Sequence, residues 1–268
     1  MPELPEVEGM RRRLKPLILG RRIESAEDVS GTATRSFTGV PFDVGVVGRR
    51  FTDTGRRAKN LLLTLDSGDT LVMHFMRNGM LEYAATGEVR APHTWAVLSL
   101  DDGMDLRMRD TMRAGRWSLC PGTDLSAVNT LQGLGPEYTD PVFSVEYLAK
   151  RLSRKAPVKA LLTDQSVVSG IGNAYAHEIA WEAGVRPDRQ SASLNDGEAA
   201  RLHAAISSVF ERAIEARVSS PLNIMGDEGW EVARIHRRKG QKCPRCGAGI
   251  VSDKLGGGLI YYCAGCQK

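Results

Sequence analysis

The sequence has no long apolar run. None of its apolar stretches approaches the ~20 residues that a membrane-spanning helix needs. Residues 1–6 carry neither the basic segment nor the apolar segment of a secretory signal. We therefore expect a protein without membrane association that lies in the cytoplasm, and on the nucleoid if the source is bacterial.

Cysteine is scarce, with five residues among 268, which excludes a small secreted domain stapled by disulfides. Four of the five form two C-x-x-C pairs: Cys243 and Cys246, then Cys263 and Cys266. This spacing is typical of a zinc ribbon, because each pair supplies two thiolates from one tight turn. Four protein ligands leave no open position, so we expect one structural Zn²⁺ rather than redox cysteines. Cys120 stands apart, and we expect a small buried residue rather than a nucleophile.

The chain has little excess of either charge, since its net charge is only +4 at pH 7. Its distribution is uneven, because residues 231–268 contain eight Lys or Arg and only two Asp or Glu. A basic C-terminal module on a near-neutral body favours a polyanionic partner, most often nucleic acid. The alternative is a basic face that is simply solvated.

Hydrophobic spacing divides the rest of the chain. Val7, Met10 and Leu14 recur at helical spacing, which predicts a short helix after Pro5. Short apolar runs separated by turn residues then predict strands between about residues 23 and 119. The clearest runs and turns are residues 60–65, 67–69, 70–75, 94–100 and 101–103. These features predict an antiparallel β-sandwich.

Helical patterns follow. Residues 157–168 and 174–183 flank a glycine turn at residues 170–173, and Asn195 with Glu198 predicts the capping box of a longer helix. A helix beginning at Asn173 offers free N–H groups to a phosphate, with Lys159 nearby, although such glycines are usually only a turn. We expect a catalytic β-sandwich domain at 1–128, a linker at 129–143, a helical DNA-binding domain at 144–232 and a zinc ribbon at 233–268.

The N-terminal segment offers unusual chemistry. If Met1 is removed, Pro2 carries a free secondary amine beside Glu3. An unprotonated amine is a nucleophile toward a sugar C1′ or an aldehyde, and its reference pKa of ~8 lies well below that of lysine. A neighbouring carboxylate can transfer the protons. Composition alone favours the simpler interpretation, a proline-containing leader that caps a helix.

Together these motifs resemble one family, the formamidopyrimidine-DNA glycosylases and endonuclease VIII enzymes of base-excision repair, and the formamidopyrimidine branch more closely. The resemblance runs nearly end to end. The segments that carry it are residues 2–8 (PELPEVE), 55–63 (GRRAKNLLL), 134–137 (LGPE), 159–162 (KALL), 164–165 (DQ), 170–173 (GIGN), 175–176 (YA), 238–240 (RKG) and the four cysteines.

The resemblance implies an α+β multidomain fold, in which an N-terminal β-sandwich with a helix precedes a helix–two-turn–helix domain and a four-cysteine zinc ribbon. It implies a monomeric, bifunctional DNA glycosylase and abasic-site lyase. The expected partner is double-stranded DNA that holds a damaged base or abasic site in the cleft between the domains, with the damaged nucleotide extruded. The alternative is a catalytically silent paralogue that binds damaged DNA.

Residue roles follow from the same resemblance. Pro2 matches the nucleophile that attacks C1′, Glu3 the acid/base, and Glu6 a supporting carboxylate. Lys59 matches a lysine that reaches the lesion and its phosphate. The implied DNA contacts are Lys59, Arg77, His93, Met112, Arg113, Lys159, Asn173, Arg238, Lys239 and Lys254.

The chain departs from the family where damage is recognised. Arg77 stands where the family has Met, Met112 where it has Arg, Ala114 where it has Phe, and Gly258 where the ribbon carries an Arg. Residues 219–232 also look shorter than the family's lesion-capping loop. We therefore expect retained N-terminal chemistry and a different lesion preference.

Overall fold

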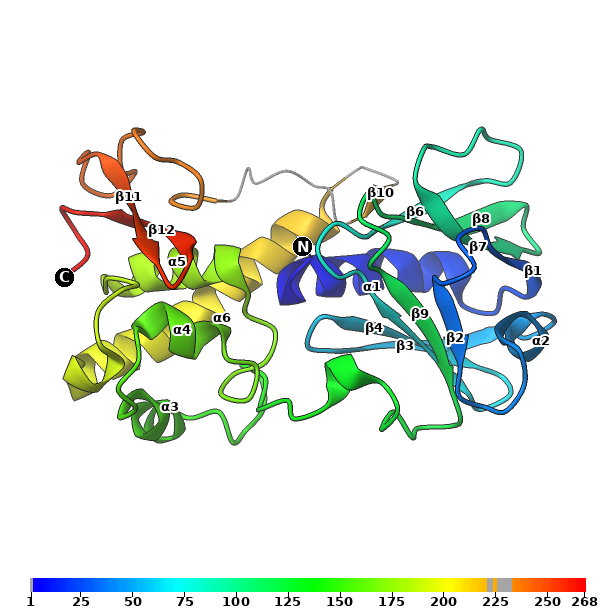
Figure 1. Ribbon diagram of the computed structural model, residues 1–268, viewed down its shortest axis with the longest axis horizontal. Helices are drawn as coiled ribbons and strands as arrows, with labels where there is room; N and C mark the ends of the chain where they lie inside the picture. Colours follow the sequence, from blue (N-terminus) through cyan, green and yellow to red (C-terminus); the bar gives the residue numbers. More distant parts are fainter. Residues whose placement is uncertain (1, 221–223, 226–232) are drawn as a thin grey trace. The chain divides into compact units, whose positions relative to one another are not determined.

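The computed structural model describes residues 2–220, 224–225 and 233–268 (Figure 1). The chain divides into two compact units. Unit 1 contains Met1–Gln132 and Ile214–Glu228, and unit 2 contains Gly133–Ala213 and Gly229–Lys268. The described part of the chain has no helix long and apolar enough to cross a membrane. Met1 and most of the expected short loop at 219–232 lie outside the described residues.

Unit 1 holds the β-sandwich. Its elements are α1 (Leu4–Ile18), β1 (Ile23–Asp28), β2 (Thr34–Ser36), α2 (Phe42–Val46), β3 (Phe51–Arg57), β4 (Asn60–Leu65), β5 (Thr70–His74), β6 (Met80–Ala85), β7 (Thr94–Leu100), β8 (Met104–Arg109), β9 (Arg116–Cys120), the 3-10 helix η1 (Asn129–Leu131) and β10 (Ile224–Met225). One sheet has the order β1-β7-β8-β6-β10 and the other β2-β9-β5-β4-β3. The expected sandwich is thus confirmed.

Strand pairing follows the predicted hairpins. The turns at 67–69 and 101–103 connect the antiparallel pairs β4–β5 and β7–β8. One expectation was wrong, because the domain is not wholly antiparallel. The short strand β2 pairs with β9 in parallel, with Thr34 opposite Trp117. Parallel partners lie far apart in sequence, so no turn signal announces them.

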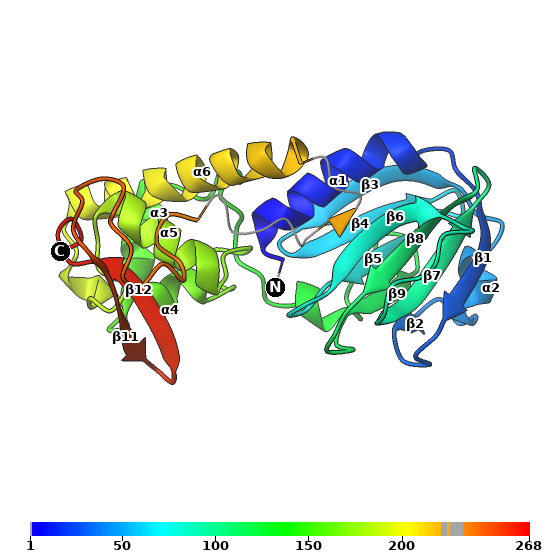
Figure 2. The same ribbon diagram turned by 90° about the horizontal axis from the view of Figure 1, so that it is seen from above.

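The core of unit 1 lies between the two sheets and is closed by α1, which packs on β3 and β4 (Figure 2). The apolar face of α1 is fully buried there, as the spacing of Val7, Met10 and Leu14 predicts. Alternation in β4 sends Leu61 and Leu63 into this core. The helix ends at Ile18, and its C-cap residue is Leu19.

Unit 2 is helical. Its elements are α3 (Val145–Leu152), α4 (Val158–Thr163), α5 (Asn173–Ala183), the 3-10 helix η2 (Ser191–Ser193), α6 (Asp196–Val218), β11 (Ile250–Leu255) and β12 (Gly258–Cys263). Helix α6 begins at the predicted capping box, since Asn195 and Glu198 exchange N–H bonds of 2.9 and 3.0 Å. From Ile214 onward α6 belongs to unit 1.

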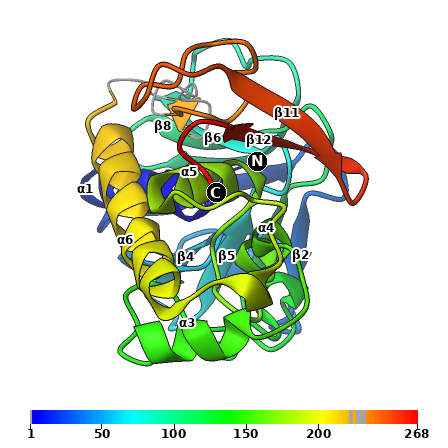
Figure 3. The ribbon, with the colours of Figure 1, turned by 90° about the vertical axis from the view of Figure 1, so that its left-hand side faces the viewer.

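The C-terminal hairpin of β11 and β12 packs against α5 through β12 (Figure 3). Helix α5 also holds the chain that enters the hairpin. The buried carboxylate of Glu178 accepts the backbone N–H groups of Arg234, Ile235 and His236 at 2.8–3.0 Å. The ribbon is therefore fixed to the helical unit before its first cysteine.

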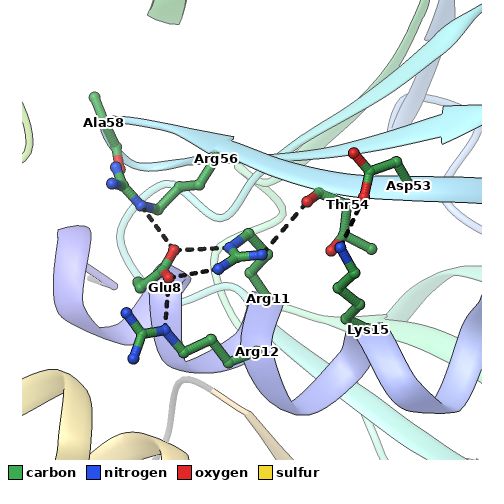
Figure 4. Close-up of polar contacts among 8 residues, drawn as sticks. All are labelled: Glu8, Arg11, Arg12, Lys15, Asp53, Thr54, Arg56 and Ala58. Atoms are coloured by element: carbon green, nitrogen blue, oxygen red, sulfur yellow. Dashed lines mark hydrogen bonds and ion pairs between the residues drawn. The ribbon is translucent and has the colours of Figure 1, made fainter.

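Helix α1 is attached to β3 by a cluster of charges (Figure 4). The nearly buried carboxylate of Glu8 accepts bonds from Arg11 at 2.7 and 2.9 Å, from Arg12 at 2.7 Å and from Arg56 at 3.3 Å. Arg56 also donates to the carbonyl of Ala58 at 3.0 Å. The cluster therefore connects the helix to the turn between β3 and β4.

These bonds predict how stability depends on pH. Burial alone would raise the pKa of Glu8, but bonds from Arg11 and Arg12 and the charge of Arg56 lower it from 4.5 to about 2. A lowered native pKa gives stability that is present above pH 4.5 and lost as the pH falls toward 2. We expect Glu8→Gln to lower the free energy of unfolding by about 1–3 kcal/mol at pH 7, and by less at pH 3.5, in urea titrations.

The ion pair of Lys15 and Asp53 provides the control, because it joins the same helix and strand at 3.0 Å but is exposed. Asp53→Asn should cost less than about 1 kcal/mol. An equal cost for the two substitutions would contradict a special role for the Glu8 cluster.

Candidate active site and metal centre

The first turn of α1 is held by its own carboxylates. Glu3 is its N-cap, and its side chain accepts the backbone N–H of Glu6. Glu6 returns the bond, because its Oε2 accepts the N–H of Glu3 at 2.9 Å. Both carboxylates are buried, and Pro2 precedes them in a buried position. The backbone that carries the expected nucleophile is therefore fixed on its C-terminal side.

Lys59 lies in the turn between β3 and β4, where Ala58 adopts a left-handed conformation with φ 50°. Burial lowers the pKa of Lys59, and the charges of Glu3 and Glu6 partly oppose this shift. The structure thus brings three of the predicted catalytic residues into one electrostatic cluster directly after Pro2. A lysine with a lowered pKa beside two carboxylates can exchange protons or bind an anion.

His74, at the end of β5, also faces this cluster. Burial and the charge of Lys59 lower the pKa of His74 to about 4, so the ring is neutral at pH 7. Its Nδ1 accepts the N–H of Met76 at 3.1 Å. The sequence analysis did not select His74 as a functional residue, because nothing in an apolar strand indicates what the last side chain faces.

Arg217 is a second residue that the sequence analysis missed. Its Nε donates to Oε1 of Glu6 at 3.1 Å, and the two side chains are only 4% and 5% exposed. The partners are 211 residues apart in the chain. Arginine in the last turn of a helix is common for dipole reasons alone, so its position gave no signal of this contact.

A turn at residues 110–115 presents the predicted damage-recognition residues of unit 1. The buried carboxylate of Asp110 accepts the backbone N–H groups of Met112, Ala114 and Gly115 at 2.7–2.8 Å. Met112 stands at the turn and is 50% exposed. The backbone of this turn is fixed while its side chains remain available.

Arg113 follows Met112 with φ 53°, and its guanidinium stacks on the ring of Trp95 at 3.9 Å from the centroid. Trp95 in turn donates its indole N–H to the carbonyl of Asp110 at 2.5 Å. His93 and Arg77, both expected to contact DNA, are exposed in neighbouring loops. The cation–π contact therefore sets the orientation of Arg113.

In unit 2, the glycine turn precedes α5 as predicted. Gln165 holds it by accepting the N–H of Gly170 at 3.0 Å and donating to the carbonyl of Ile171 at 2.7 Å. Asn173 is exposed at the first position of α5. Asn173 is therefore accessible at the start of the helix.

Lys159 is not exposed, as a residue that contacts a DNA phosphate would be. It is 9% exposed, and its Nζ donates to the carbonyl of Leu259 at 3.2 Å. Beside it, the Nδ1 atoms of His177 and His236 share a hydrogen bond of 2.9 Å. Burial is the main cause that lowers the pKa of these rings to about 3 and about 4, so both are neutral at pH 7.

The ribbon presents the other basic residues. Arg238 is half-buried and bonds to Gln241 at 3.1 Å, whereas Lys239 and Lys254 are exposed. Gly258 starts β12 and is exposed. These side chains lie in unit 2 on segments that precede or form the hairpin.

The four cysteines of the two pairs form one cluster, and their sulfur atoms lie within 4.8 Å of one another. Sγ of Cys243 is 3.7 Å from that of Cys266, and Cys246 is 3.4 Å from Cys263. These residues could hold a metal ion. Cys120 is buried as expected, and burial raises its pKa to about 11, which makes it a poor nucleophile.

Comparison with known proteins agrees with this geometry. Residues 1–117 match the formamidopyrimidine-DNA glycosylase N-terminal domain, and residues 134–222 match the formamidopyrimidine-DNA glycosylase H2TH domain. The formamidopyrimidine-DNA glycosylase of Desulforamulus reducens is 38% identical over 100% of this chain and 99% of its own length.

Solved structures give the same result. The Lactococcus lactis Fpg protein in complex with DNA containing an abasic site has a TM-score of 0.90 and 28% identity, over 99% of each chain. The same protein with DNA containing N7-benzyl-Fapy-dG has a TM-score of 0.89 and 27% identity, over 100% of each chain. The chain therefore belongs to the formamidopyrimidine-DNA glycosylase family.

Proposed function

We propose that the protein is a bifunctional enzyme, a DNA glycosylase that also cleaves the strand at the resulting abasic site through an imine at Pro2. The observation that carries the proposal is the cluster of two buried carboxylates, Glu3 and Glu6, with the half-buried Lys59 at the turn that Pro2 begins. The family's structural relatives were solved with abasic-site and damaged-base DNA, and double-stranded DNA of this kind is the proposed substrate.

The proposed reaction begins with the unprotonated nitrogen of Pro2, which forms a bond to C1′ of the damaged nucleotide. The glycosidic C1′–N bond breaks with its electron pair on the base, which takes up the proton that the amine releases. The sugar ring opens when its oxygen accepts a proton from Glu3, and an iminium remains at C1′. Loss of a proton from C2′ expels the 3′ phosphate, and a later loss from C4′ expels the 5′ phosphate.

Other residues bind the DNA in this proposal. Lys59 contacts the phosphate of the damaged nucleotide, and Asn173 binds a phosphate at the start of α5. Arg77, His93, Met112 and Arg113 face the duplex from unit 1. The proposed contacts from unit 2 are, besides Asn173, Arg238, Lys239 and Lys254. Lys159 is not among them, because it is buried and bonds to the carbonyl of Leu259.

We assign Zn²⁺ to the four-cysteine cluster. Tetrahedral zinc with Zn–S bonds of ~2.3 Å separates its sulfurs by about 3.8 Å, and the observed separations of 3.4 and 3.7 Å fit this value. The indole N–H of Trp181 points to Sγ of Cys243 at 3.4 Å, as expected beside a thiolate ligand. When bound, the ion supplies structural stabilisation of the ribbon.

The nucleophile can be tested by reducing the imine. Borohydride treatment of the protein with an abasic-site duplex should give a stable covalent link, because reduction converts the iminium to an amine. Peptide mapping should place the link at Pro2. An N-terminal extension should abolish the link, since it converts the amine to an amide, and Pro2→Gly should weaken it.

Two results would count against this assignment. A link that maps to Lys59 would identify a different nucleophile. If Met1 has been removed and the Pro2 amine is free, tight binding of the abasic duplex without any covalent link would favour the catalytically silent paralogue.

Removal of one thiolate should test the role of the metal site without changing the catalytic cluster. We expect one zinc ion per chain by elemental analysis, and none in Cys263→Ser. Without the ion the hairpin should unfold, and DNA affinity should fall by about tenfold or more as its phosphate contacts are lost. Cys120→Ser is the matched control and should keep its zinc; full affinity of the zinc-free protein would refute a DNA-binding ribbon.

Met112 should affect recognition of the base opposite the lesion. Methionine has no donor comparable with arginine, so excision should depend weakly on the opposite base and be poor on 8-oxoguanine relative to ring-opened purines. Met112→Arg should add a cytosine preference of ~1–3 kcal/mol, measured as excision rates against four opposite bases.

Val44→Arg provides the control for added charge, because Val44 is an exposed apolar residue on α2. It should leave the opposite-base preference unchanged. Strong, cytosine-restricted excision of 8-oxoguanine by the unaltered protein would mean that other residues perform this recognition.

A further inference from the structure

Arg217 binds the first turn of α1 from the last turn of α6. Its Nε donates to Oε1 of Glu6 at 3.1 Å, while Oε2 of the same carboxylate accepts the N–H of Glu3 at 2.9 Å. Glu6 therefore bridges a guanidinium and the peptide that follows Pro2. The pair is almost completely buried, and breaking a buried pair by removing one partner leaves an uncompensated charge.

Gly9 makes this contact possible. A Cβ at position 9 would overlap the Cβ of Arg217 and lie 3.4 Å from its Cγ and its carbonyl carbon. Glycine weakens a helix interior relative to alanine, so its presence in the middle of α1 has a cost to the helix. The close approach of Arg217 gives that cost a structural reason.

We propose that Arg217 is a positioning residue, which acts through Glu6 to fix the Pro2–Glu3 peptide and hence the direction of the Pro2 amine. The identity of the nucleophile rests on the proposed function. The contact itself does not, because the two bonds of Glu6 described above join groups of this chain.

Among the residues that the structure describes, charged groups face Glu6 from α6, from the β3–β4 turn and from the start of α1. Arg217 comes from α6, Lys59 from the turn between β3 and β4, and Glu3 from the start of α1. Without Arg217, the buried carboxylate of Glu6 loses its hydrogen-bonded cation, and the Glu3 N–H that it accepts is no longer held from α6.

The first experiment compares Arg217→Met with the unaltered protein on an abasic-site duplex. The rate of imine trapping at pH 7 should fall about 100-fold, as expected for a displaced nucleophile. The dissociation constant and its salt dependence should not change, whereas a lost phosphate contact would reduce the salt slope by about 0.9. Arg217→Lys should recover part of the rate, because it restores the charge but not the Nε–H.

Arg212→Met is the matched control. Arg212 lies on the same helix, and its guanidinium makes exposed bonds to Ser208 and Glu182. Its loss should leave the trapping rate unchanged. Equal effects of the two methionine substitutions would overturn the proposal.

Gly9→Ala provides a second way to displace Arg217, and it leaves every charge in place. The new methyl group should displace Arg217 and lower the trapping rate, whereas in an Arg217→Gly background it should have no further effect, because the Cβ that it would overlap is gone. A Gly9→Ala protein that traps at the normal rate would overturn the proposal. This test remains decisive if Arg217→Met fails to fold.

Hydrogen exchange separates this inference from the proposed function. The amide of Glu3 should exchange at least about tenfold faster in Arg217→Met, measured on the N-terminal peptide by mass spectrometry. Unchanged exchange would overturn the positioning role. Failure of the unaltered protein to form a covalent link would contradict the proposed nucleophile alone, and the exchange rates would still decide the role of Arg217.

Discussion

The candidate active site depends on how α1 compensates the carboxylates that it buries in its first two turns. These three carboxylates have different types of partner. Glu3 accepts a hydrogen bond from a backbone N–H, Glu6 accepts one from Arg217, and Glu8 accepts bonds from three guanidinium groups. A buried carboxylate without such partners would be protonated or would destabilise the fold. The need for compensation therefore fixes both the β3–β4 turn and the last turn of α6 against one helix.

The same cluster of charges also helps to hold the turn that carries Lys59. Its turn is held on one side by Arg56, through the carbonyl of Ala58, and on the other by Asn60, which donates to the carbonyl of Arg57 at 3.2 Å. Burial then lowers the pKa of Lys59. Structural charges and reactive charges thus share one small region of unit 1, and the structural ones set the electrostatic environment of the others.

Features with a local signal could be predicted from the sequence. The strands at 60–65 and 94–100, the capping box of Asn195 and Glu198, and the thiolate cluster all follow from periodicity, turn chemistry or ligand spacing within a short window. The family resemblance supplied the roles of Pro2 and Glu3, which composition alone did not favour.

Contacts across long separations could not be predicted. Arg217 and Glu6 are 211 residues apart in the chain, and they meet where the last turn of α6 contacts the start of α1. Lys159 has the sequence context of a phosphate ligand, yet the β12 hairpin a hundred residues later supplies the carbonyl that it binds.

The turn that contains Met112 separates backbone geometry from side-chain identity. The carboxylate of Asp110 accepts main-chain N–H groups of this turn, so residues 112 and 114 can be exchanged during evolution without rebuilding the loop. Selection can thereby alter what the loop recognises while its backbone geometry is inherited intact.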